Sequence, residues 1–191
     1  MNTKSLKQSN KGFTLVELCV TIVIFTILVS TAVFGLIQWQ EFSTYRQQTE
    51  NAEIVYMAAR SKLVKLKANN ALDELKINTK ATNISNAVST YTGKTVYSAM
   101  CKKTDYADYN DPTKTLDEST KLLFDLIEEF IYDKSILNAC ISIEFTEDGT
   151  ILAVYYSDRC DEFKYGSGQV DLTQRTTENL EDNMVGYYEA S

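Results

Sequence analysis

The chain has 191 residues, a net charge of −7 and no histidine. An acidic chain is a poor general nucleic-acid binder, because phosphate binding needs a basic surface. Without histidine, neither a Ser-His-Asp triad, a Cys-His pair nor an imidazole metal site can form. We therefore expect the chain to form one domain with an appendage. We do not expect it to act as an enzyme or to hold a metal or cofactor.

The first part of the chain combines a basic leader with a long apolar run. Residues 1–12 contain three lysines and no acidic residue. The 20 residues from Leu18 to Ile37 carry no charge, and as a helix they would extend for about 30 Å, the thickness of the hydrocarbon core of a bilayer. Acidic residues follow this run. The charge bias predicts a membrane helix over residues 13–37, with its N-terminus in the cytoplasm and the rest of the chain outside.

Two residues near the start of the apolar run are unusual. Gly12 closes the basic leader and precedes Phe13. Glu17 lies inside the run, where a carboxylate costs about 2.5 to 3.5 kcal/mol. Two interpretations of Glu17 are open: it lies near enough to the membrane surface to stay hydrated, or it meets a positive partner within an assembly.

The residues around these positions resemble the class III signal of type IV pilins and pseudopilins. They read Lys11-Gly12-Phe13-Thr14-Leu15-Val16-Glu17-Leu18. The resemblance implies that a membrane prepilin peptidase cuts between Gly12 and Phe13 and methylates the new amine of Phe13. It also implies that Glu17 neutralises the N-terminal ammonium of a neighbouring subunit in a fibre. Many pilins have a proline within this helix, whereas this chain has Gly35 there and its single proline is Pro112.

The resemblance further implies a cellular role and its partners. The subunit would leave the cell membrane and join other pilin subunits, through their N-terminal helices, in a pilus or pseudopilus outside the membrane. Assembly-platform proteins and a separate motor ATPase would drive this step, and no nucleic acid is expected to bind. The missing proline and an irregular head favour a minor pilin or pseudopilin. The alternative is a membrane-anchored extracellular binding protein that does not polymerise, for which Gly12 and Glu17 would be dispensable.

Helical periodicity continues after the apolar run, over residues 38–69. Apolar residues recur every three or four positions and charged residues interleave with them. The apolar positions are Ala52, Val55, Ala59, Leu63 and Leu66. The pattern predicts one helix from Phe13 to Asn69 whose second half packs on a head; the alternative is two helices with a break near Thr44.

Residues 70–191 are predicted to form a small extracytoplasmic head. Residues 78–120 are polar and read as irregular, with a turn at Asp111-Pro112. A short amphipathic helix is expected over residues 118–132, with cap residues at its start. Its acidic pair, Glu128 and Glu129, is expected to be a solvated surface.

A β-hairpin over residues 139–157 follows this helix. The segment Cys140–Thr146 alternates apolar and polar residues, whereas the segment from 151 to 156 is uniformly apolar and is expected to be the more buried strand. Residues 163–165 are a candidate third strand. The acidic tail ends in Gly186-Tyr187-Tyr188, which either adds an edge strand or stays mobile. Together these elements predict an α+β fold, a long helix on a small antiparallel sheet, as in pilins.

Three of the four cysteines lie in the head, where disulfides persist outside the cell. Cys19 lies in the apolar run and is expected to act as a small apolar residue. The hairpin favours a bond between Cys140 and Cys160, and pairing of Cys101 with either remains open.

Two clusters of side chains in the head allow a binding role. Interleaved acidic residues at Asp105, Asp108 and Asp111 suggest either a Ca²⁺ loop or, as we favour, a solvated acidic loop. The tyrosines of the head suggest either an adhesive surface or, as we favour, residues that fill the margins of the sheet.

Overall fold

The computed structural model describes residues 13–72, 96–146, 148–164, 166, 170–172 and 176–189. The chain divides into two units, residues 1–42 and 43–191, and the boundary falls within the first helix. This helix, α1 (Leu15–Ala68), has no break in its hydrogen-bonded run. The predicted continuous helix is therefore confirmed, and the alternative with a break near Thr44 is wrong.

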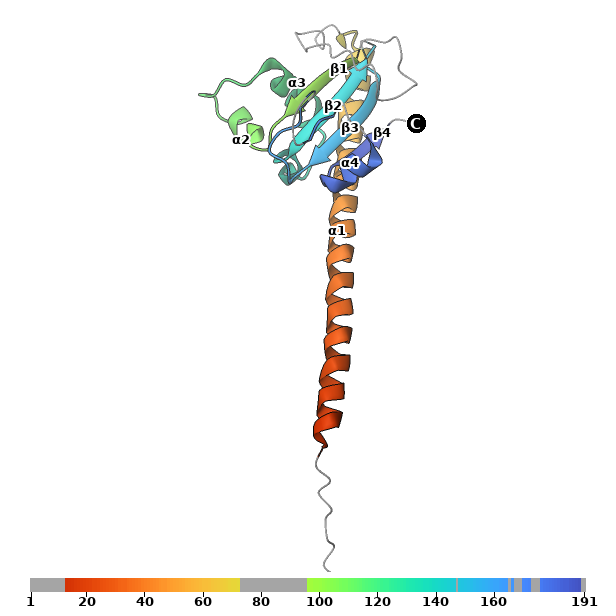
Figure 1. The fold of residues 1–191 in the computed structure, drawn as a ribbon. Helices are drawn as coiled ribbons and strands as arrows, with labels where there is room; N and C mark the ends of the chain where they lie inside the picture. Colours follow the sequence, from red (N-terminus) through yellow and green to blue (C-terminus); the bar gives the residue numbers. More distant parts are fainter. Residues whose placement is uncertain are drawn as a thin grey trace, which may run out of the picture. The chain divides into compact units, whose positions relative to one another are not determined.

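A four-stranded antiparallel sheet forms the centre of the second unit, with its strands side by side in chain order (Figure 1). The strands are β1 (Val96–Cys101), β2 (Cys140–Thr146), β3 (Ile151–Ser157) and β4 (Gly186–Glu189). The β2 and β3 strands form the predicted hairpin. Of the two alternatives left open for the segment from Gly186, the structure has the edge strand, β4. Because the second half of α1 packs on this sheet, the expected α+β, pilin-like architecture is confirmed.

Two strand predictions are wrong. The β1 strand lies within residues 78–120, which were expected to be irregular, and it pairs with β2 along its whole length. The candidate strand at residues 163–165 is reduced to one isolated bridge, between Lys164 and Asp171. The physical reason is local: the Lys164 N–H donates to the Val170 carbonyl (3.1 Å), so this segment pairs with the chain just after it. Tyr165 lies outside the described residues.

Both faces of the sheet are covered. On one face, α1 and α3 (Glu118–Ile127) pack against alternate side chains of the strands. The α1 residues that face the sheet are those predicted from the periodicity: Ala52, Val55, Ala59 and Leu63 are buried, and Leu66 is partly buried. On the other face, residues after β3 pack against Cys140 and Tyr155, and these include Phe163, Val170, Leu172 and Leu180 of α4 (Thr177–Asp182).

The expectation that β3 is more buried than β2 is wrong, because every residue of both strands is buried. The polar positions of β2 share this burial, since Ser142 and Glu144 are 0% and 1% exposed. The segment that follows β3 covers the face of the sheet on which these two side chains lie. The alternating sequence of β2 alone does not indicate that a later segment covers this face.

The helix predicted over residues 118–132 ends earlier, at Ile127. Asp117 caps its start by accepting the Ser119 N–H (3.3 Å), as the cap signal predicts. At its end, the Ile131 N–H still reaches the Ile127 carbonyl (3.2 Å), but the Lys134 ammonium donates to the Glu128 carbonyl and closes the turn. Two short helices flank α3: α2 (Asp105–Tyr109) and η2 (Lys134–Leu137).

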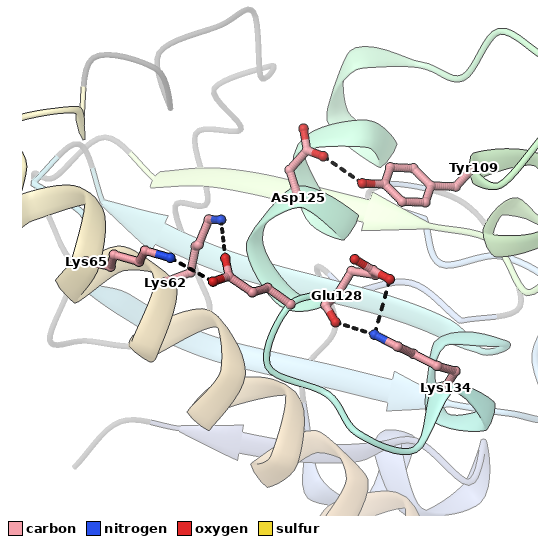
Figure 2. Close-up of polar contacts among 7 residues, drawn as sticks. Lys62, Lys65, Tyr109, Asp125, Glu128 and Lys134 are labelled. Atoms are coloured by element: carbon pink, nitrogen blue, oxygen red, sulfur yellow. Dashed lines mark hydrogen bonds and ion pairs between the residues drawn. The ribbon is translucent and has the colours of Figure 1, made fainter. Parts of the chain in front are cut away.

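The turn after α3 is held to α1 by a carboxylate between two lysines. Lys62 and Lys65 each place their ammonium nitrogen 2.7 Å from a different oxygen of Glu129. In Figure 2, dashed lines run from Lys62 and Lys65 to a carboxylate that carries no label, and these are the two contacts with Glu129. Hydrogen bonds from Lys62 and then Lys65 lower the pKa of Glu129 to about 2. Of the acidic pair that was expected to be simply solvated, Glu129 is thus part of the attachment of α1, and Glu128 pairs with Lys134 (3.2 Å).

The backbones of α1 and β4 approach each other closely at Gly186. A Cβ atom built on Gly186 would lie 2.1 Å from the carbonyl carbon of Gln48 and 2.2 Å from the Thr49 nitrogen. Gln48 is fully buried. Its amide nitrogen donates to the Asp158 carboxylate (2.8 Å) and its amide oxygen accepts the Asp158 N–H (3.1 Å). Backbone contact and a two-point hydrogen bond therefore fix α1 on the sheet.

Replacing Gly186 with alanine should force β4 away from α1, because the added methyl group meets backbone rather than a side chain that can move. We expect the Gly186→Ala variant to lose about 2 kcal/mol of unfolding free energy, which lowers Tm by about 5 °C. Circular dichroism melts of the detergent-solubilised full chain measure this. The matched control is Glu189→Ala in the same strand, and an equal Tm for both variants would contradict the close-contact account.

Acid should release the contact at Glu129. The pKa of this carboxyl is lower in the folded chain than its ordinary value of 4.5, so its contribution to stability is present above about pH 4.5 and is lost as the pH falls toward 2. We expect Glu129→Gln to flatten the fall of Tm over this range. The control is Glu189→Gln, which removes an exposed carboxylate that does not contact the two lysines. If Tm depended on pH equally in both variants, the contact at Glu129 would be ruled out.

Candidate functional site

The first turn of α1 is closed by reciprocal hydrogen bonds between Thr14 and Glu17. The Glu17 carboxylate accepts the Thr14 backbone N–H (2.9 Å) and the Thr14 hydroxyl (2.8 Å). The Glu17 N–H in turn donates to the Thr14 hydroxyl oxygen (3.2 Å). This is a capping box, which satisfies donors that the start of a helix otherwise leaves unpaired. The carboxylate also lies at the positive end of the helix dipole.

The capping box gives Glu17 partners within its own chain. Neither sequence interpretation of Glu17 included it, although the signal was present: threonine followed three residues later by glutamate, just before an apolar run, is the capping-box pattern. Pairing of Glu17 with the amine of a neighbouring subunit stays a prediction. Gly12 lies outside the described residues, and Phe13, the first of them, is 85% exposed.

The first unit of the chain presents an apolar surface on all sides of the helix. Every residue from Phe13 to Phe42 is exposed. The most apolar window of α1 has a mean hydropathy of 2.6 with none of it buried, and by length and composition the helix can cross a membrane. Beside Gly35 there is open space, since no described atom apart from its chain neighbours and the nearby helix backbone lies within 4 Å of a Cβ built there.

The hydroxyl groups of this segment form their hydrogen bonds within the helix and do not depend on water as a partner. They donate to carbonyl oxygens one turn earlier in the helix: Thr21 to Leu18 (2.8 Å), Thr26 to Ile22 (2.8 Å), Ser30 to Thr26 (2.8 Å) and Thr31 to Leu28 (2.9 Å). Internal hydrogen bonds of this kind allow Ser and Thr to lie in an apolar environment. The surface of the segment is therefore suited to lipid or to other apolar helices.

The comparison with known families identifies this part of the chain. Residues 7–33 match the family model described as the prokaryotic N-terminal methylation motif. The chain carries a prepilin-type N-terminal signal. No curated protein and no solved structure matches the chain. The match covers the end of the leader, the capping box and most of the exposed apolar segment, and it agrees with the pilin-like architecture of the head.

The cysteines of this prepilin-type chain are free thiols, and the structure brings two of them together. Cys140 and Cys160 lie in hydrogen-bond contact through their side chains, and the Cys140 thiol also lies 3.1 Å from the Cys160 carbonyl oxygen. The hydrogen bond from Cys140 lowers the pKa of Cys160, whereas that same bond and burial raise the pKa of Cys140. The Cys160 thiol is therefore the one that ionises first.

Cys101 lies apart from this pair. It packs in the core between the sheet and α1, whereas Cys140 and Cys160 belong to the cluster on the opposite face of the sheet. Its thiol donates to the Ala139 carbonyl (3.4 Å), and burial raises its pKa. Cys19 is exposed on the apolar segment of α1. Of the pairings left open by the sequence, the geometry therefore favours Cys140 with Cys160.

The acidic residues considered for Ca²⁺ each have a partner close in sequence. Asp105 accepts the Lys102 N–H (2.7 Å), Asp108 lies 3.8 Å from the Lys114 ammonium, and Asp111 accepts the Thr113 N–H (2.9 Å). In the described part of the chain, no group of three or more His, Cys, Asp or Glu residues could hold a metal ion. These contacts stabilise the turns around α2.

Most tyrosines considered as an adhesive surface take part in packing. Tyr106 and Tyr109 lie against Phe124, with ring centroids 5.4 and 5.0 Å away. The Tyr109 hydroxyl donates to Asp125 (2.8 Å; Figure 2), and Tyr155 and Tyr156 are buried in β3. Tyr132 is an exception because it is fully exposed.

Oxidation should join Cys140 to Cys160 in protein from native cells. The bond would close a loop of about 20 residues, which is worth about 3 kcal/mol of unfolding free energy. We expect peptide mapping without reductant, after alkylation, to find a Cys140–Cys160 cross-link and an alkylated Cys101. The control Cys101→Ser should keep this cross-link, and a cross-link that includes Cys101 would show that the contact between the two thiols does not direct oxidation.

Proposed function

We propose that the chain is a structural subunit, a minor pilin or pseudopilin, that prepilin peptidase cuts between Gly12 and Phe13 and methylates at the new amine. The observation that carries the proposal is an apolar helix, exposed on every side, directly behind a prepilin-type signal. Such a surface needs an apolar environment along its whole length. A membrane supplies it before assembly, and the helices of neighbouring subunits supply it in a fibre.

The capping box suggests how Glu17 serves both states. Before assembly, Thr14 supplies two donors to the carboxylate, which lowers the cost of placing it at the start of an apolar segment. Cleavage after Gly12 would create an ammonium group one residue before Thr14. In a fibre, the ammonium of a neighbouring subunit would replace or join these donors, and two opposite charges buried together cost far less than either alone. This pair would set the axial register of the helices.

The partners follow from this role. They are the prepilin peptidase, other pilin subunits that contact the apolar helix, and assembly-platform proteins driven by a separate motor ATPase. The subunit would start in the cell membrane with its N-terminus in the cytoplasm and end in a pilus or pseudopilus outside it, and it would not act as an enzyme. Gly35 in place of a helix proline supports a minor pilin or pseudopilin over a major pilin.

The second candidate is an anchored extracellular binding protein that does not polymerise. The apolar helix alone fits it equally well, since one membrane span explains the exposed surface. The two candidates differ at Gly12 and Glu17, which only the fibre subunit needs. The match of residues 7–33 to the methylation motif favours the fibre subunit.

Replacing Glu17 with valine tests the proposal. We expect the variant to stay in the membrane but to fall about tenfold or more in the fraction sheared from the cell surface, because the neighbouring ammonium then lacks its partner in an apolar bundle. The control is Cys19→Ala, which replaces an uncharged side chain close to Glu17 in the same helix. In the wild type, mass spectrometry of the N-terminal peptide should find methylated Phe13 in the sheared fraction. An intact Met1 terminus, with Glu17→Val displayed normally, would support the anchored protein instead.

A further inference from the structure

The two thiols on the face of the sheet opposite α1 differ in exposure. Cys140, the first residue of β2, is fully buried, whereas Cys160, which follows β3, is partly exposed. The Cys140 thiol lies 3.1 Å from the Cys160 carbonyl oxygen, and the two side chains are in hydrogen-bond contact. A small reagent from solution can therefore approach Cys160 while the head is folded, and it reaches Cys140 only when the head opens locally.

Contacts from the segment that follows β1 hold this pair of thiols in place. The Lys103 ammonium donates to the Asp158 carbonyl oxygen (2.6 Å), and the Lys102 ammonium lies 3.5 Å from the Glu162 carboxylate. The two contacts lie on either side of Cys160 in the sequence. The pair is therefore arranged before any bond joins the two sulfurs, which favours a reaction within the pair over a second reaction with an external molecule.

Hydrogen bonds give the two thiols different roles. The Cys140 thiol donates to Cys160, and this bond lowers the pKa of Cys160 and raises the pKa of Cys140. The backbone N–H of Lys103 donates to the Cys140 sulfur and acts in the opposite direction on its pKa. The thiolate is the form that attacks a disulfide. Cys160 supplies it first, and once Cys160 has reacted and no longer accepts a hydrogen bond as a thiolate, the Lys103 N–H supports a thiolate at Cys140.

We propose that Cys160 is the site at which the folded head exchanges with a small-molecule disulfide, and that Cys140 resolves the product. The Cys160 thiolate attacks one sulfur of the external disulfide, a mixed disulfide forms on Cys160, and the other half leaves as a thiolate. The Cys140 thiolate then attacks the Cys160 sulfur, and the second half leaves. The chain loses two protons and two electrons, and the external disulfide becomes two thiols. The inference does not rest on the proposed function.

This order of reaction gives the disulfide a place in the formation of the head. Because Cys140 attacks a bond already formed on Cys160, the cross-link arises after folding has brought the two segments together. Asp158, two residues before Cys160, makes both hydrogen bonds to Gln48 of α1. The cross-link joins the segment of Asp158 to the start of β2, so it reinforces the attachment of α1 in a head that is already folded.

A brief exposure to glutathione disulfide tests the order. The detergent-solubilised full chain, carrying Cys19→Ala so that only the thiols of the head react, is reduced, freed of reductant, exposed and quenched with acid. Trypsin cuts after Arg159, so Cys140 and Cys160 fall on separate peptides. We expect glutathione to accumulate on Cys160 in the Cys140→Ser variant. In the Cys160→Ser variant, Cys140 should react about tenfold more slowly or less, because it is buried and lacks a stabilised thiolate.

With both thiols of the pair present, the head should release both halves of the glutathione disulfide and form the Cys140–Cys160 cross-link. Cys101, buried on the opposite face of the sheet, is the internal control and should stay unmodified. Equal rates at Cys140 and Cys160 in the two single variants would overturn the proposal.

A second measurement leaves the pair unsubstituted, so it stands even where a variant fails to fold. Brief alkylation of the reduced chain with iodoacetamide should label the Cys160 peptide about tenfold faster than the Cys140 peptide. Equal labelling of the two peptides, or faster labelling of Cys140, would overturn the proposal. Neither result bears on the cleavage after Gly12, so the proposed function is tested separately.

Discussion

Backbone touches backbone where Gly186 of β4 meets Gln48 and Thr49 of α1, and the arrangement of the head depends on this contact. It brings the helix close enough for Gln48 to hold the end of β3 through Asp158. The inward face of α1 is then filled by the sheet and α3, and Glu129 attaches the turn after α3 from the side. The side of α1 that faces away from the sheet stays exposed, and it includes Ile54, Met57 and Val64.

Three sets of charged residues on α1 have different physical roles. Glu17 is held by donors of its own turn, which makes a carboxylate tolerable beside an apolar surface. Lys62 and Lys65 converge on one carboxylate of the head and help fix the helix there. Glu53 and Arg60 are left to solvent in the single chain. Under the proposed function, one helix has to be stable in a membrane, on a head and between subunits, and it uses all three arrangements along its length.

Local sequence patterns predicted the parts of this chain that depend on local physics. Helical periodicity identified the buried positions Ala52 and Leu63, and alternation with a turn identified the hairpin. The start of α1 was also predictable, since Thr14 and Glu17 have capping-box spacing, but that pattern lay inside the stronger pilin resemblance. Partners distant in the chain were not predictable: β1 forms a strand because β2 lies beside it, and Glu144 is buried because residues after β3 cover it. Likewise, no pattern around Glu129 indicates that two lysines of α1 lie opposite.

The β4 strand follows the other three strands of the sheet in the chain, and it packs directly on α1. Gln48 and Asp158, 110 positions apart, must also meet before either is satisfied. High sequence separation between contacting elements slows folding, and here it also sets an order of events. The head cannot close while β4 is still in the ribosome or, under the proposed function, still crossing the membrane. Completion of folding would then follow completion of export, and a chain truncated before β4 would leave this face of α1 exposed to quality-control proteases.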